Sequence, residues 1–182
     1  MQYEKSCGAL VLRKDKADGK YYVLMIRHRM GGHRSFPKGH MERGETERMT
    51  AVREVYEETA VQIRIRPDFR ETVHYHPLPG VSKEVVYFLS ETENAAVKAR
   101  EGEIAQVEWV PVESAEASLS HENDKMVFRA AIKKSILQRY GIRDLHDVPA
   151  IARQAVEAQI SRWSDVRLMM KCRDALAAEG GT

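Results

Sequence analysis

The chain has 182 residues, of which 43% are hydrophobic and 31% charged, so it can bury the core of one ordinary domain and carry an appendage. Its formal net charge of +2 argues against a protein that coats DNA or a membrane surface. Two widely separated cysteines, Cys7 and Cys172, exclude a disulfide scaffold and a cysteine zinc site. We expect a soluble, cytoplasmic protein, because the sequence shows neither a secretory signal nor the ~20 apolar residues of a membrane span.

The first 110 residues alternate strand-like runs with turns. Residues 7–12 and 21–26 are apolar runs of strand length, and the polar segment between them predicts a hairpin loop. Further strands are predicted at 63–65, 72–76, 84–89 and 108–110, with a turn at 77–80. Residues 85–89 are apolar on both faces, which is typical of a strand that is covered on both sides.

After Pro111 the pattern becomes helical. Apolar residues recur at helical spacing over 127–136, 151–163 and 168–176. We therefore predict a domain at residues 1–140 and a C-terminal helical extension at 141–182, docked on the domain or forming a homodimer through its helices. Equal numbers of acidic and basic residues in the extension argue against a nucleic-acid arm.

The most informative helix is predicted to begin after Thr46, a favourable N-cap residue. Its buried face is expected to carry Ala51, Val52, Val55 and Thr59. Three glutamates, Glu54, Glu57 and Glu58, fall at i, i+3 and i+4 on an adjacent face and would repel one another. A divalent cation would relieve that repulsion, and oxygen ligands favour Mg²⁺ or Mn²⁺. The alternative is a solvated acidic helix face.

The segment before this helix favours the metal. Between Lys20 and Met41 there are five lysines and arginines, three histidines and no acidic residue. Cations for phosphate oxygens beside carboxylates for a metal are the arrangement that polyphosphate chemistry requires.

The same region resembles the Nudix box, G-x5-E-x7-R-E-U-x-E-E-x-G-U. Every fixed position but one matches, through Gly39, Glu45, Arg53, Glu54, Val55, Glu57, Glu58 and Val61. The resemblance implies an α/β (α+β) Nudix fold over about residues 3–140, a mixed β-sheet sandwiched between helices. It also implies that Glu54, Glu57, Glu58 and the Gly39 carbonyl hold Mg²⁺, and that Arg53 pairs with Glu45.

One position departs from the box. Ala60 stands where the family has the glycine that ends the helix in a left-handed conformation, which costs alanine roughly 1 kcal/mol. Either this helix ends differently or the chain bears that cost.

A narrower resemblance begins just before the box. Residues 36–45, FPKGHMERGE, are similar to the signature of asymmetric dinucleoside tetraphosphate hydrolases. In that group an acidic residue six positions before a strand tryptophan serves the metal or the attacking water. Counting back from Trp109 gives Glu103, with Glu101 as its competitor. Lys38, His40 and Lys83 are candidate phosphate contacts, and Tyr87 is a candidate for stacking on adenine or, alternatively, a core residue.

The implied activity is Mg²⁺-dependent hydrolysis of a phosphoanhydride in a small nucleotide. We expect diadenosine tetraphosphate to yield ATP and AMP, with Glu54, Glu58 and Glu103 all open as the general base. The alternative substrates are a 5′-triphosphate RNA end, an inositol pyrophosphate and a damaged nucleoside triphosphate. A non-enzymatic Nudix-fold nucleotide sensor is the alternative outside enzymology.

Overall fold

The computed structural model describes residues 1–139, which contain seven strands and three helices. The strands are β1 (Gln2–Lys14), β2 (Tyr21–His28), β3 (Arg34–Ser35), β4 (Lys38–His40), β5 (Arg64–Tyr75), β6 (Val81–Glu91) and β7 (Ile104–Pro111). The helices are α1 (Glu47–Thr59), α2 (Val112–Ser118) and α3 (Glu122–Arg139). The seven strands form one mixed sheet, which together with the three helices confirms the predicted α+β class.

Strand β1 organises the sheet. It runs parallel to β6 along almost its whole length, from Gln2 opposite Val81 to Leu12 opposite Glu91. On its other edge β1 pairs antiparallel with β4 in its middle and with β2 near its end. The sheet continues through β2 to β3 and β7 on one side, and through β6 to β5 on the other. Because β1 changes partner, Lys38 and Gly39 of β4 are held in the sheet beside β1, where they contact Glu58 and Glu54 of α1.

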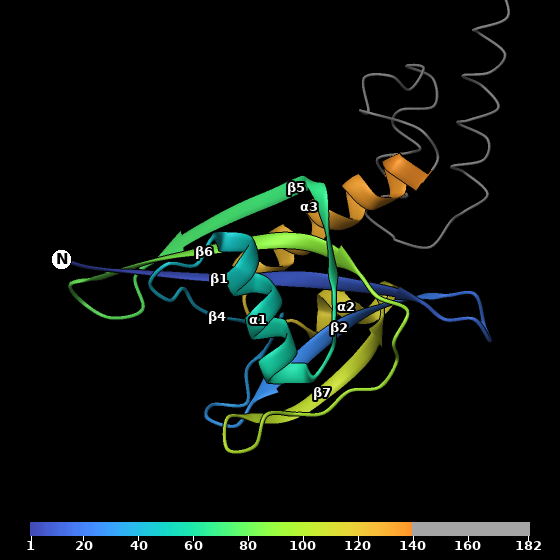
Figure 1. Cartoon of the computed structure of the whole chain (residues 1–182), viewed down its shortest axis with the longest axis horizontal. Coiled ribbons are helices and arrows are strands. Elements are labelled where there is room, and N and C mark those ends of the chain that lie inside the picture. The colour runs from blue at the N-terminus through green and yellow to red at the C-terminus, as the bar shows by residue number, and fades with distance from the viewer. Residues whose placement is uncertain (140–182) are drawn as a thin grey trace, which may run out of the picture. The chain divides into compact units, whose positions relative to one another are not determined.

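Helix α1 covers one face of the sheet and α2 lies behind the sheet in the same view (Figure 1). Beneath α1 the core contains Cys7, Ala9, Val11, Leu24, Ala51, Val55, Val61, Val86 and Phe88. Strand β6 is buried on both faces, as its sequence predicts. The predicted burial of Val52 is wrong, since that residue is 41% exposed.

The start and end of α1 follow from its cap residues. Thr46 accepts a hydrogen bond from the backbone N–H of Met49 (3.2 Å), which confirms the predicted N-cap. At the other end Ala60 has φ +59° and its N–H donates to the Tyr56 carbonyl at 2.7 Å. The helix therefore ends in the left-handed conformation without the glycine that favours it, and the chain bears the cost.

The predicted strands at 63–65 and 72–76 are in fact one strand, β5, with an irregularity in its pairing to β6 between Ile65 and Arg70. Pro67 and Asp68 lie within this irregular stretch, where the register of the pairing to β6 shifts.

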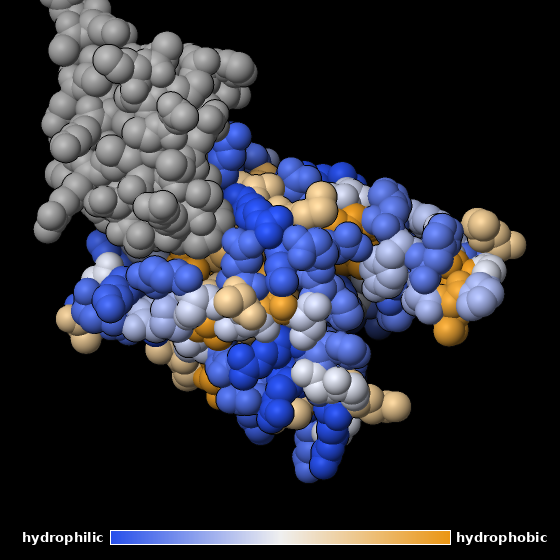
Figure 2. All heavy atoms as spheres, turned by 180° about the vertical axis from the view of Figure 1, so that it is seen from behind, coloured by the Kyte–Doolittle hydropathy of each residue, from blue (hydrophilic) through white to orange (hydrophobic). Residues whose placement is uncertain are grey.

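The chain divides into two compact units, and the first, residues 1–127, contains the whole sheet. The predicted helical extension at 141–182 lies outside the described residues, and its boundary at 140 stays a prediction. Seen from behind the view of Figure 1, the described surface carries mainly hydrophilic side chains with scattered hydrophobic ones (Figure 2). None of the described helices is long and apolar enough to span a bilayer.

Candidate active site

The loop before α1 is fastened to that helix by an ion pair. Arg53 donates to the Glu45 carboxylate through Nε (2.6 Å) and Nη2 (2.9 Å), and Nη2 also donates to the His40 carbonyl (2.9 Å). Thr50 adds a hydroxyl hydrogen bond to Glu45 at 2.7 Å. Arg53 and Thr50 together lower the pKa of Glu45 to about 2. The predicted Arg53–Glu45 pair is confirmed, and it fixes the loop over the first turns of α1.

Gly39 is required by the position of Glu54. A Cβ atom at residue 39 would lie 2.0 Å from the carboxylate carbon of Glu54, so no larger residue fits without moving that side chain. Glu54 itself is only 7% exposed, and Arg53 Nη1 donates to its Oε1 at 2.7 Å. The loop backbone and the Glu54 carboxylate therefore pack directly against each other.

Glu58 is the most deeply buried carboxylate of the box. Its side chain accepts a hydrogen bond from the backbone N–H of Lys38 at 2.9 Å, and the residue is 2% exposed. Burial raises the pKa of Glu58 to about 8, although the Lys38 N–H and ammonium group both act in the opposite direction. Charge on this carboxylate is therefore costly unless a cation faces it.

The segment before β7 brings Glu103 to the same helix. The backbone N–H groups of Lys98 and Arg100 donate to the Thr59 and Glu58 carbonyls at 2.9 and 3.1 Å, which satisfies two terminal carbonyls of α1. The Arg100 side chain then reaches Glu57 through Nη1 (3.3 Å) and Glu103 through Nε (3.3 Å). Glu103, rather than Glu101, is thus the acidic residue that shares the Arg100 guanidinium with Glu57.

The donor set suits a hard divalent cation. Glu54, Glu57, Glu58 and Glu103 offer only carboxylate oxygens, which Mg²⁺ and Mn²⁺ prefer. Within residues 1–139, however, no three acidic, histidine or cysteine side chains converge closely enough to hold an ion. The positive charge beside these carboxylates comes from Arg53, which also lies 3.5 Å from Glu57, from Arg100, and from the Lys38 ammonium that acts on Glu58.

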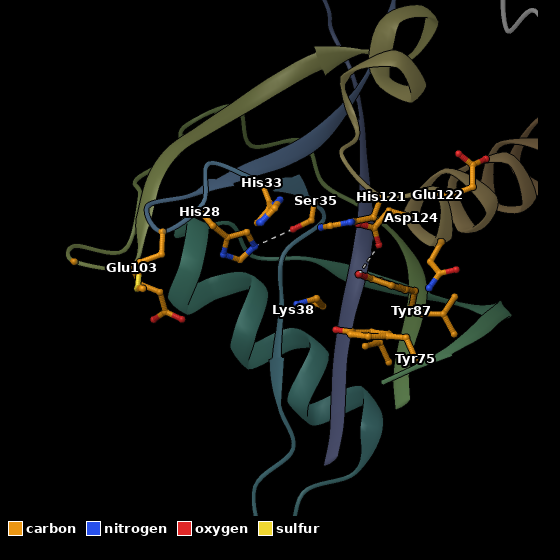
Figure 3. Close-up of a pocket in the computed structure, with 15 residues that line it drawn as sticks. His28, His33, Ser35, Lys38, Tyr75, Tyr87, Glu103, His121, Glu122 and Asp124 are labelled. Atoms are coloured by element: carbon orange, nitrogen blue, oxygen red, sulfur yellow. Dashed lines mark hydrogen bonds between the residues drawn. The ribbon is translucent and has the colours of Figure 1, made fainter. Parts of the chain in front are cut away.

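A cavity of about 760 Å³ opens beside the box (Figure 3). Lys38 lies between a histidine side and a tyrosine side of this cavity, and Glu103 lies at its edge (Figure 3). The remaining lining residues are His28, Met30, His33, Ser35, Val73, Tyr75, Val85, Tyr87, Gly102, His121, Glu122, Asn123 and Asp124.

Several side chains that line the cavity contact one another. His28 Nε2 lies 3.0 Å from Ser35 Oγ, and the rings of His33 and His121 are 4.9 Å apart. Beside His121, the Tyr87 hydroxyl donates to Asp124 at 3.1 Å (Figure 3). Aromatic rings with polar groups between them suit a planar heterocycle better than an aliphatic ligand.

The predicted substrate contacts lie in two places. Lys38 and Tyr87 line the cavity, but the Tyr87 ring is only 1% exposed, whereas Tyr75 is partly exposed there. His40 and Lys83 instead gather around Glu4, with Lys83 Nζ 3.4 Å from His40 Nε2 and 3.7 Å from the Glu4 carboxylate. Burial and the nearby Lys38 ammonium lower the pKa of Lys83. The roles of all four residues stay predictions.

Sequence reasoning did not assign the cavity residues Tyr75, His33, His121 and Asp124. They come from three separate segments, and only His121 and Asp124 lie near each other in the sequence. Only the histidine content of residues 20–41 was a usable signal, and it accounts for His28 and His33 alone.

The chain is similar to a family model, to curated proteins and to solved structures. The family model described as NUDIX domain matches residues 3–130. An 8-oxo-(d)GTP phosphatase of Mycolicibacterium smegmatis is 31% identical over 103 residues, 56% of this chain and 31% of its own. A pig asymmetrical bis(5′-nucleosyl)-tetraphosphatase is 31% identical over 104 residues, 53% of this chain and 70% of its own. A solved structure, a Caenorhabditis elegans Ap4A hydrolase binary complex, matches with TM-score 0.63 and 28% identity over 69% of this chain and 93% of that chain.

The relatives differ in length from this chain. The matches span 31% and 40% of the lengths of two mycobacterial relatives, the M. smegmatis phosphatase and a putative mutator protein MutT4 of Mycobacterium tuberculosis. The worm structure, in contrast, is matched almost from end to end.

Proposed function

This chain belongs to the NUDIX family, and on that premise we propose that it is a divalent-metal-dependent pyrophosphohydrolase of nucleoside polyphosphates. The observation that carries the proposal is that the cavity and the box share residues. Lys38 lines the cavity while its backbone N–H binds Glu58, and Glu103 lines the cavity while Arg100 joins it to Glu57. A nucleoside in the cavity would therefore place its phosphates beside the box carboxylates.

The residues have separable tasks in this proposal. Glu54, Glu57, Glu58 and Glu103, with the Gly39 carbonyl, would hold Mg²⁺ or Mn²⁺. A bound ion would neutralise phosphate oxygens and activate the attacking water. One of the carboxylates Glu54, Glu58 and Glu103 accepts the proton of that water. The Lys38 ammonium stabilises the charge that grows on the departing phosphate, and the Arg53–Glu45 pair keeps the loop in place.

Diadenosine tetraphosphate is the substrate that we propose. Its four phosphates need more cationic surface than one lysine provides. Lys38 and Lys83 would supply part of such a surface, because the Lys38 charge acts on Lys83, and His40 lies 3.4 Å from Lys83. Likeness to the pig enzyme and to the worm hydrolase structure adds support. A metal site at one end of this surface would cut the chain off-centre and release ATP and AMP.

The test is a panel of nucleotides incubated with the full chain and Mg²⁺, with the products separated by anion exchange. We expect diadenosine tetraphosphate to give equal amounts of ATP and AMP. Lys38→Ala removes the side chain but keeps the N–H that binds Glu58, so it should slow turnover roughly ten- to a hundredfold. Lys20→Ala, in the same acid-free stretch but not in the cavity lining, is the control. Two ADP molecules per substrate would refute asymmetric cleavage.

A second candidate substrate is an oxidised nucleoside triphosphate, which the name of the mycobacterial relative favours. The same panel separates the two, because 8-oxo-dGTP would yield its monophosphate and pyrophosphate. Triphosphorylated RNA and an inositol pyrophosphate complete the panel. Faster cleavage of any of these than of diadenosine tetraphosphate would reassign the substrate while leaving the pyrophosphohydrolase chemistry in place.

A further inference from the structure

Arg100 occupies an unusual position among the box carboxylates. Its guanidinium bridges two glutamates from different segments, with Nη1 3.3 Å from Glu57 and Nε 3.3 Å from Glu103. All three side chains are partly exposed, at 45% for Arg100, 38% for Glu57 and 53% for Glu103. Water and ions can therefore reach the bridge without any rearrangement of the core.

The backbone at Arg100 is held independently of its side chain. The Arg100 N–H donates to the Glu58 carbonyl, and the neighbouring Lys98 N–H donates to the Thr59 carbonyl. These bonds hold the segment at the end of α1 wherever the guanidinium points. The side chain can thus leave Glu57 and Glu103 while the segment keeps its position.

Arg53 differs from Arg100 in this respect. It binds Glu45 through two nitrogens and also the His40 carbonyl, so its release would free the loop from α1. Arg53 is only 23% exposed in its side chain, against 45% for Arg100. Of the two arginines beside the glutamates, Arg100 is the one whose side chain can move without detaching a loop from α1.

We propose that Arg100 is a built-in counter-ion that a divalent cation must displace from Glu57 and Glu103. The inference rests on the metal site of the proposed function. It gives Arg100 a positioning role: the guanidinium compensates the charge of the two carboxylates before the metal binds and keeps Glu103 beside α1. Competition with this side chain then sets the cation concentration at which the site fills.

Direct measurement of Mn²⁺ binding tests the proposal. Free Mn²⁺ is followed by electron paramagnetic resonance during titration of the full chain and of Arg100→Gln, Arg100→Lys and Lys98→Gln. Lysine keeps the charge but lacks the planar guanidinium group that bridges two carboxylates. Lys98→Gln removes the same charge from the same segment. Thermal unfolding without metal verifies that each variant is folded.

We expect Arg100→Gln to bind Mn²⁺ about two- to fivefold more tightly than the unaltered chain, a small factor because both ion pairs of Arg100 are exposed to solvent. Arg100→Lys should also bind more tightly, because its bridge is broken, and Lys98→Gln should not change the affinity. The half-maximal Mg²⁺ concentration for hydrolysis should fall in parallel with the Mn²⁺ dissociation constant.

Other results would overturn the proposal in distinguishable ways. Unchanged or weaker Mn²⁺ binding by folded Arg100→Gln would reject the role of Arg100 and leave the proposed function intact. Equal gains in Arg100→Gln and Lys98→Gln would show a general charge effect rather than displacement. Absence of Mn²⁺ binding by the unaltered chain would remove the metal site, and with it both proposals.

Discussion

Ala60 shows how a single residue can depart from a motif while the helix keeps the left-handed ending that the motif specifies. Its φ of +59° lies where glycine is normally found, yet the helix still closes through the hydrogen bond to Tyr56. The sequence identified the position but left open whether the helix would change its ending or bear the strain. The structure bears the strain at Ala60, and the glutamates of α1 all precede this position.

Ala60→Gly should therefore stabilise the protein. Relief of the left-handed strain outweighs the added freedom of the unfolded chain, and we expect about 0.5–1 kcal/mol in the free energy of unfolding. Ala117→Gly, at an exposed site inside α2, should have the opposite sign and a similar size. Urea unfolding of both variants measures this. A destabilised Ala60→Gly protein would show that the alanine methyl group makes contacts worth more than the strain.

At the scale of elements, α1 is attached to three strands by charged side chains at its first turn. Glu47 accepts two hydrogen bonds from Arg70 of β5, at 2.7 and 2.8 Å, and lies 2.7 Å from Lys5 Nζ of β1. Lys5 also lies 2.8 Å from Glu84 of β6. This network holds the beginning of the box helix against the sheet.

The network predicts a pH dependence of stability. Arg70 and Lys5 lower the pKa of Glu47 to about 2, so the folded state binds fewer protons than the unfolded state between about pH 2 and 4.5. The stabilisation is complete above pH 4.5 and is lost as the pH falls towards 2. Glu47→Gln should cost about 1–2 kcal/mol at pH 7, and its difference from the unaltered chain should vanish near pH 2.

Denaturant unfolding at pH 7, 5, 3 and 2 checks this dependence. Glu93→Gln is the control, because its side chain is 89% exposed and lies 3.5 Å from the similarly exposed Lys16. A Glu47→Gln deficit that stays constant down to pH 2 would mean that the lost contact is not ionic.

Elements differed in how far the sequence could predict them. The apolar runs of β1, β2 and β6 and the cap of α1 depend on local patterns, and those predictions hold. Strands β3 and β4 have two and three residues, too few to show a period. The parallel pairing of β1 with β6 joins segments about 80 residues apart, which no local pattern encodes.

At the scale of the molecule, the fold brings together cavity residues that lie far apart in the sequence. The motif located Glu54, Glu57 and Glu58 because its chemistry is concentrated on one helix, and the roles of these residues remain predictions. The cavity depends on β2, β5, β6 and the first turn of α3, and only the fold makes its residues neighbours. The proposed hydrolase activity depends on this cavity lying next to the box carboxylates.

Glu57 offers the most direct test of that activity. Its side chain is 38% exposed, so Glu57→Gln removes a carboxylate without opening the core, and the free energy of unfolding should stay within about 0.5 kcal/mol. Glu42→Gln, at a 71% exposed carboxylate 3.9 Å from Arg53, is the matched control.

The measurement is the release of ATP and AMP from diadenosine tetraphosphate by the full chain, with Mg²⁺ and with a chelator. We predict turnover only with Mg²⁺, roughly a hundredfold or greater loss in Glu57→Gln, and near-normal rates in Glu42→Gln. A folded Glu57→Gln protein that hydrolyses the substrate at close to the unaltered rate would contradict the proposed metal site and the activity that depends on it.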